Sequence, residues 1–144
     1  MEEREERGGA VRVGMIWGGI GGVVGLLASL LGSLVGILIS GVIGFSCGRR
    51  AAVTGRWAGA LSGLVGGAVA APAYVLGSTI GALLTARMIG AAEIATTLSN
   101  MLGTHVSADL AWTYFLFSLV LSALLEAVIL VSVSSAAGAW ANRE

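Results

Sequence analysis

Lysine is absent from this chain, and charge of either sign is scarce. Only 11% of the 144 residues are charged and all eight basic residues are arginine, whereas a soluble domain has about 25% charged residues. Without lysine the chain cannot build a phosphate-binding loop that requires one. The net charge is zero and no basic stripe is present, so we expect no nucleic-acid partner.

Cysteine and histidine each occur once. Cys47 alone allows no internal disulfide and no cysteine-based metal site. His105 lies four residues before Asp109, but two side chains fall short of the three or four ligands of a zinc site, and we expect a polar helix start instead. No nucleophile–base pair or dinucleotide loop can be assembled. We therefore expect no catalytic residue, no cofactor, no metal and no enzymatic activity.

Hydrophobic residues make up 56% of the chain and gather in three long runs. The runs are Val13–Cys47, Trp57–Ala86 and Leu110–Ala141, and Glu126 is the single charge inside them. Uncharged stretches of about 18 or more residues are typical of membrane-spanning helices. The sequence therefore predicts an all-α, multi-pass integral membrane protein.

The first run is too long for one span. Its 35 residues would extend about 52 Å as one helix, and the hydrocarbon core is only about 30 Å thick. Two short helices joined near Ser29–Ser33, where Gly32 tolerates a positive φ, fit instead. We predict one transmembrane domain over 13–141, a bundle of four transmembrane helices. Its spans are about 13–30, 33–48, 57–85 and 110–138.

The distribution of arginine predicts that both termini are cytoplasmic. Cytoplasmic flanks carry an excess of arginine, and four spans place seven arginines inside and only Arg87 outside. The N-terminal tail 1–12 and the C-terminal end 142–144 are then cytoplasmic. Within the tail, glutamates and arginines at helical spacing can form weak pairs. The four tryptophans fall near the predicted span ends, as interfacial anchors do.

Residues 88–103, between the third and fourth spans, predict one external amphipathic helix. Apolar side chains recur there every three or four residues, at Met88, Ala91, Ala95, Leu98 and Leu102. Such a stripe is typical of a helix that lies on the membrane surface or against the spans. We expect this helix to end at Gly103, and Ser107 or Asp109 to cap the next span.

The chain has 23 glycines, many of them repeated every fourth residue. The two main GxxxG rows are Gly14, Gly18, Gly22 and Gly55, Gly59, Gly63, Gly67. Residues four apart share one helix face, and small residues there let two backbones approach closely in a membrane. We predict glycine-zipper packing. Two uses of the rows stay open, namely packing among the spans of one chain and contact with another subunit.

Glu126 lies near the middle of the fourth predicted span. A carboxylate at bilayer depth costs several kcal/mol unless it is protonated, paired or facing a polar cavity. One interpretation is a group that binds a proton or an ion. The other is a neutral acid hydrogen-bonded to a serine of a neighbouring helix, or paired with an arginine of a partner subunit.

The segment 41–67, GVIGFSCGRRAAVTGRWAGALSGLVGG, resembles the central hairpin of small glycine-rich four-span membrane protein families of unknown function in bacteria and archaea. The resemblance implies a four-span architecture in a prokaryotic plasma membrane and carries no catalytic residue. The segment 123–127, ALLEA, is similar to the carboxylate helix of rotary-ATPase proteolipids. Their preceding loop faces the cytoplasm, however, whereas the arginine count puts it outside here.

These features favour a non-enzymatic membrane protein that acts as a helix-packing homo-oligomer or as an accessory subunit of a membrane complex. Its partners would be the lipid bilayer and either itself or other membrane subunits. The alternative is an ion- or proton-conducting subunit that uses Glu126. Substitution of Glu126 by Gln separates the two, because an accessory protein tolerates it and a proton carrier does not.

Overall fold

The computed structural model describes the backbone of residues 2–51 and 55–141, and within these ranges the chain is helical without strands. Its helices are α1 (Glu2–Ser29), α2 (Ser33–Ala51), α3 (Arg56–Ile89), α4 (Ala91–Leu102) and α5 (Ala108–Trp140). The predicted all-α class is confirmed. The C-terminal end 142–144 and the predicted charge pairs of the N-terminal tail lie outside what the structure describes.

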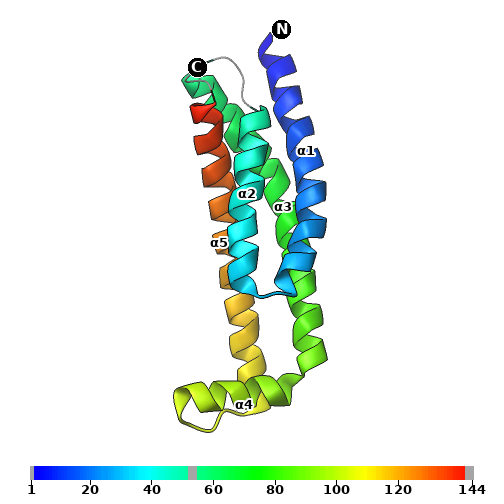
Figure 1. Ribbon diagram of the computed structural model, residues 1–144, viewed down its shortest axis with the longest axis vertical. Helices are drawn as coiled ribbons and strands as arrows, with labels where there is room; N and C mark the ends of the chain where they lie inside the picture. The colour runs from blue at the N-terminus through cyan, green and yellow to red at the C-terminus, as the bar shows by residue number, and fades with distance from the viewer. Residues whose placement is uncertain (1, 52–54, 142–144) are drawn as a thin grey trace.

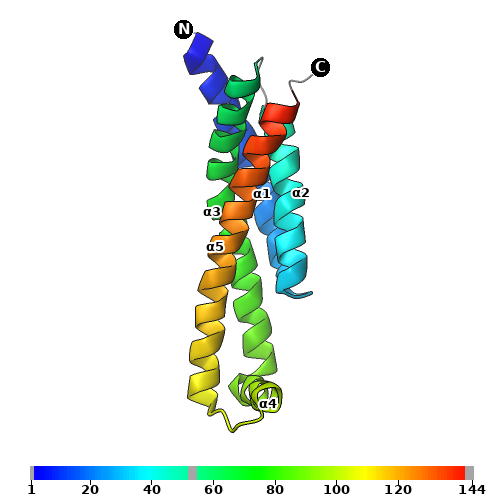
Figure 2. The same ribbon diagram turned by 90° about the vertical axis from the view of Figure 1, so that its left-hand side faces the viewer.

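Four of these helices, α1, α2, α3 and α5, are long and apolar enough to cross a membrane. This agrees with the predicted membrane protein. They lie side by side, and α4 runs across one end of the group (Figure 1). Helix α3 packs on α1 and α5, and α2 packs on α5 and α1. The start of α1 and the end of α5 both lie at the end opposite α4 (Figures 1 and 2).

The predicted turn near Ser29–Ser33 is confirmed. Helix α1 ends at Ser29, α2 begins at Ser33, and Gly32 between them has φ 117°, which glycine adopts without strain. Helix α1 begins already at Glu2, so residues 2–12 of the segment predicted as a separate tail, 1–12, continue the helix of the first predicted span. The reason is local, because glutamate and arginine are good helix formers and no proline interrupts them.

The amphipathic helix is shorter than the predicted 88–103. Gly90, with φ 92°, separates α4 from α3, and Met88 therefore belongs to the last turn of α3, where its side chain is exposed. Within α4 only part of the predicted apolar stripe is packed against the rest of the chain. Ala95 is buried and Leu98 packs beside it, whereas Leu102 is exposed.

Both predicted signals in the loop after α4 are present. Gly103 ends α4 in the left-handed conformation, with φ 67°. Ser107 is the cap of α5, and its hydroxyl accepts a hydrogen bond from the backbone N–H of Leu110 at 3.3 Å.

The long helices differ in length, since α1 with 28 residues and α2 are shorter than α3 and α5, and this difference creates the site. Helices α3 and α5 have 34 and 33 residues, or about 50 Å each, whereas α2 has 19 residues, or about 28 Å. The α1–α2 turn therefore stops part of the way along α3 and α5 (Figures 1 and 2). The segments of α3 and α5 that run from their last contacts with this hairpin to α4 (residues 78–89 and 108–126) are called their distal halves.

The core lies where all four long helices pack together. Its centre is Tyr74 of α3, which is the largest fully buried side chain. Around it pack Ile43 and Cys47 of α2, Ala70 of α3 and Leu130 of α5. The Tyr74 hydroxyl donates a hydrogen bond to the carbonyl oxygen of Gly36, one turn into α2, and this ties the hairpin end of α2 to α3.

Candidate polar site around Glu126

The first glycine row packs α1 against α3. A Cβ built on Gly14 would lie 2.6 Å from the carbonyl oxygen of Gly66, and one on Gly22 would lie 2.8 Å from that of Ala73. A Cβ on Gly18 would lie 3.0 Å from the Cα of Ala70. The two backbones therefore touch at positions where a side chain would not fit.

The second row packs α3 against α5 from its second member onward. Side chains built on Gly63 and Gly67 would collide with Ser134 of α5, and Gly59 is buried at the same contact. The Ser134 hydroxyl donates to the Gly63 carbonyl oxygen at 2.7 Å. Gly55 differs from the other members of its row, because it precedes α3 with φ 104° and has only Ala58 Cβ near its built Cβ, at 3.9 Å.

Shorter glycine pairs complete the packing. Gly44 and Gly48 of α2 lie against the backbone of α5, and Gly77 and Gly81 of α3 lie against α1. Gly138 of α5 also meets the backbone of α3, a contact that was not predicted from the sequence. The spacing of small residues could have indicated this contact, since Ser134 stands four positions before Gly138. With the exception of Gly55, both main rows therefore pack against helices of the same chain.

Glu126 is buried, with 4% of its surface exposed, between α5, α2 and α3. The Ser78 hydroxyl of α3 donates to its Oε2 at 2.6 Å. On the other side, Oε1 lies 2.8 Å from the position that a Cβ on Gly36 would occupy. The carboxyl group is thus held by one hydrogen bond, and it fits beside α2 because Gly36 has no side chain.

Ser78 can serve Glu126 in both protonation states. Its hydroxyl oxygen also lies 3.1 Å from the carbonyl oxygen of Val75, and a hydroxyl has a single hydrogen to donate. When Glu126 is ionised, that hydrogen points to the carboxylate. When Glu126 is protonated, the acid donates to Ser78, whose hydrogen turns to Val75. The roles of Ser78 and Gly36 beside Glu126 were not predicted from the sequence, because they depend on which helices meet.

Glu126 also lines a cavity of about 410 Å³, which we call the polar niche. The niche lies between the α1–α2 turn, the distal halves of α3 and α5, and α4. Its lining residues are Ser29, Gly32, Gly36, Ser78, Thr79, Ala82, Thr85, Ala86, Ile89, Ile94, Phe115, Ser118, Leu119, Ser122, Ala123 and Glu126. Serine and threonine are common among them, and Glu126 is the one charged residue.

Three hydroxyl groups of the niche can only accept hydrogen bonds from a ligand, because each already donates to a carbonyl oxygen of its own helix. Ser29 donates to the carbonyl oxygen of Leu26, Thr85 to that of Gly81 and Ser118 to that of Phe115. Since these three hydroxyl hydrogens are used by their own helices, the free lone pairs on the three oxygens remain for a ligand. The lining is thus rich in hydrogen-bond acceptors and carries one carboxyl group.

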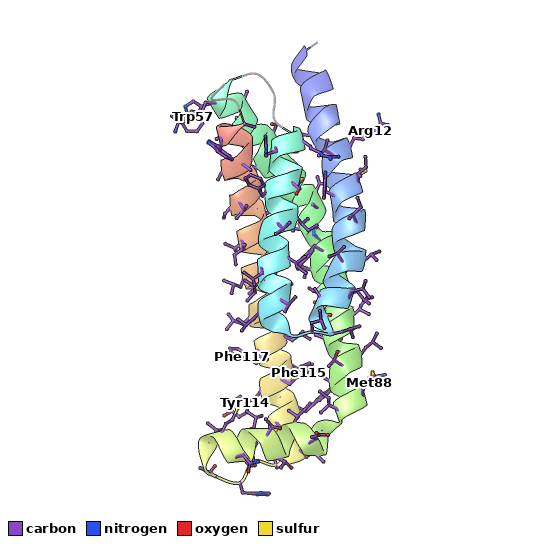
Figure 3. All side chains as sticks on the ribbon, in the orientation of Figure 1. Arg12, Trp57, Met88, Tyr114, Phe115 and Phe117 are labelled. Carbon is purple, nitrogen blue, oxygen red and sulfur yellow. The ribbon has the colours of Figure 1, made fainter. Side chains whose placement is uncertain are left out.

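An apolar groove of about 540 Å³ adjoins the niche between α4 and α5. It is lined by Ile94, Leu98, Leu102, Tyr114, Phe115, Phe117 and Ser118. Three of these residues, Ile94, Phe115 and Ser118, also line the niche. Figure 3 shows Phe115 on the side of α5 that faces α3, and Tyr114 and Phe117 on its other side.

Most of the described arginine and tryptophan side chains lie at the end opposite α4, whereas Arg87 and Trp112 lie near α4. The guanidinium of Arg50 lies over the Trp17 ring at 5.2 Å, and Trp57 and Arg12 lie at the same end (Figure 3). At the α4 end, His105 and Asp109 are exposed and lie outside the niche lining.

Across the part of the chain that the structure describes, no group of three or more His, Cys, Asp or Glu side chains comes together as a set of metal ligands. No family model, no curated protein and no solved structure matches the chain. The chemistry of the polar niche is therefore interpreted from its own residues.

Proposed function

We propose that this chain is a four-span membrane protein, packed as a glycine zipper, in which Glu126 binds protons or cations as part of an ion- or proton-conducting subunit. The observation that carries the proposal is a buried acid on the wall of a polar niche whose lining holds no basic residue. Intramembrane acids that face a polar cavity are typical of ion and proton pathways. We propose no enzymatic activity.

The aromatic residues support a position of Glu126 at mid-membrane. Trp112 and Trp140 are separated by about 42 Å of helix, which is close to the thickness of about 40–45 Å of a bilayer with its headgroups. Glu126 lies midway between them along α5. The arginine-rich end then faces the cytoplasm, and the niche occupies the outer half of the membrane.

The close packing of the bundle on the arginine side supports exchange of ions between the niche and the outer side of the membrane. There the backbones of α1, α3 and α5 are in contact at Gly14, Gly63 and Gly67. Contacts of this kind leave little room for water. Passage to the inner side would therefore require the α1–α2 hairpin to move relative to α3 and α5, as in a carrier.

Substitution of Glu126 by Gln tests this function. In liposomes that enclose a pH-sensitive dye, under an applied membrane potential, we expect the wild-type chain to pass protons. The Glu126→Gln variant should lower the rate at least about tenfold, toward that of empty liposomes, because the amide cannot release a proton. Glu93→Gln, the same change on the exposed face of α4, should leave the rate unchanged.

Equal rates for wild type and Glu126→Gln, with both proteins folded and inserted, would contradict the conducting role. The neutral interpretation of Glu126, as a packing residue bonded to Ser78, would then replace it.

An accessory subunit is the second candidate function. The observation that favours it is the lining of the niche, to which α1, α2 and α4 contribute only Ser29, Gly36 and Ile94 beside the walls of α3 and α5, so that a helix of another subunit could close it. Native mass spectrometry of the chain extracted with its own membrane tests this. Stoichiometric association with another protein supports the accessory role, and a lone chain contradicts it.

A further inference from the structure

The polar niche opens sideways, toward the space that lipid occupies around the spans. The α1–α2 hairpin and α4 lie on the same side of the α3–α5 pair (Figure 2) and bound the niche at its two ends. Around the turn, Leu30, Leu31 and Leu34 are exposed. A molecule that arrives from the bilayer would therefore pass an apolar rim before it reaches the polar lining.

The lining specifies the chemistry of the group that fits it. An ionised Glu126 only accepts hydrogen bonds, and the hydroxyls of Ser29, Thr85 and Ser118 have given their hydrogens to helix carbonyls. No lining residue is basic, so an anionic head such as a phosphate would meet repulsion without compensation. A positively charged group with several N–H donors complements both the charge and the acceptors.

The apolar groove specifies the remainder of the molecule. It shares Phe115 and Ser118 with the niche, and its other walls are apolar side chains of α4 and α5. An alkyl chain attached to a head group in the niche could therefore leave it through this groove. Niche and groove together match an amphiphile that has one small polar head.

We propose that the polar niche binds the ammonium head of a lipophilic primary amine that enters from the bilayer, with its alkyl chain in the groove between α4 and α5. This inference rests on the proposed role of Glu126 as a cation site and names the class of its ligand. The ammonium N–H groups donate to the Glu126 carboxylate and to the hydroxyl oxygens of the niche.

Binding to a protonated Glu126 releases one proton. The acid loses its hydrogen to water, the ammonium takes the vacated place, and the Ser78 hydrogen turns from Val75 back to Glu126. Tyr74 is the titratable side chain next to this group on α3, and its hydroxyl is engaged with the Gly36 carbonyl. The α1, α2 and α4 residues in the lining are not titratable. The affinity should consequently rise with pH until Glu126 is fully ionised.

The test measures the binding of radiolabelled dodecylammonium to the full chain in nanodiscs, with empty nanodiscs subtracted. We expect saturable binding of about one amine per chain, weaker by tenfold or more in Glu126→Gln and unchanged in Glu93→Gln. Dodecanol, which has the same alkyl chain without the charge, should not compete. Equal affinity of wild type and Glu126→Gln, or equal competition by dodecanol, would overturn the proposal.

A second pair of variants keeps the test valid if Glu126→Gln fails to fold. Ser118→Phe fills the junction of niche and groove and should abolish binding, whereas Val120→Phe on the exposed side of α5 should not. Unchanged binding in Ser118→Phe would overturn the proposed location. If proton flux depends on Glu126 but amine binding does not, the amine proposal is rejected and the conducting role stands. If Glu126→Gln reduces neither proton flux nor amine binding, the amine proposal and the conducting role are both rejected.

Discussion

Replacing Gly77 with Ala is expected to destabilise the protein by about 3 kcal/mol, because the added methyl group would overlap the backbone of α1 at Gly22. Backbone atoms cannot move aside as a flexible side chain can, so α1 and α3 must separate along their whole contact. Since native proteins are stable by only about 5–15 kcal/mol, this loss is a large share of the total. The measurement is the free energy of unfolding in bicelles, by steric trapping.

Gly19→Ala is the matched control for Gly77→Ala. Gly19 also lies in a transmembrane helix, but nothing stands within 4 Å of its built Cβ. Its substitution should leave the unfolding free energy unchanged or raise it by up to about 1 kcal/mol through helix propensity. Equal effects of the two substitutions would contradict close α1–α3 packing. A Gly77→Ala variant that only dissociates an oligomer would move the glycine contact to a subunit interface.

Replacing Tyr74 with Ala is expected to cost about 3–5 kcal/mol, the range found when a large buried aromatic side chain is removed. Tyr74 is fully buried, and its ring fills the space beside Gly21 and Gly25 of α1 and Ile43 of α2. Truncation leaves a cavity where three helices meet. The same unfolding measurement applies, and a loss below about 1 kcal/mol would contradict a rigid core at this position.

Tyr74→Phe separates the ring from its hydroxyl. The ring still fills the core, but the hydrogen bond to the Gly36 carbonyl oxygen is lost, and we expect a cost of about 1 kcal/mol. Because Gly36 also contacts Glu126, this variant should change proton flux more than its stability suggests. A variant with normal flux would show that the position of α2 at Gly36 does not matter to the site.

Several features of the fold were predictable because they depend on neighbouring residues alone. The helices and the turn at Gly32 follow from long uncharged runs and from the length that one span can have. Errors arose where a single glycine changed the outcome. Gly90 ends α3 and removes Met88 from the amphipathic helix, and Gly55 precedes α3 with a positive φ instead of joining the row of Gly59.

The candidate site was only partly predictable. The presence of one acid in a long apolar run identified Glu126, because burial of a carboxylate in lipid is costly whatever surrounds it. Its partners Ser78 and Gly36 lie far from it in the sequence, on different helices. Glycine spacing indicated that backbones approach closely, but it left open whether the neighbour was in the same chain.

The all-α class, the apolar helices, the turn at Gly32 and the single acid within a long apolar run could be read from the residues alone, since these follow from local propensity and from the cost of charge in hydrocarbon. Only the tertiary structure decided which glycine faces which helix and where the polar niche lies. The niche exists because α1 and α2 are shorter than α3 and α5 and end about one helical turn beyond the level of Glu126, and such a difference acts only once the helices are packed side by side.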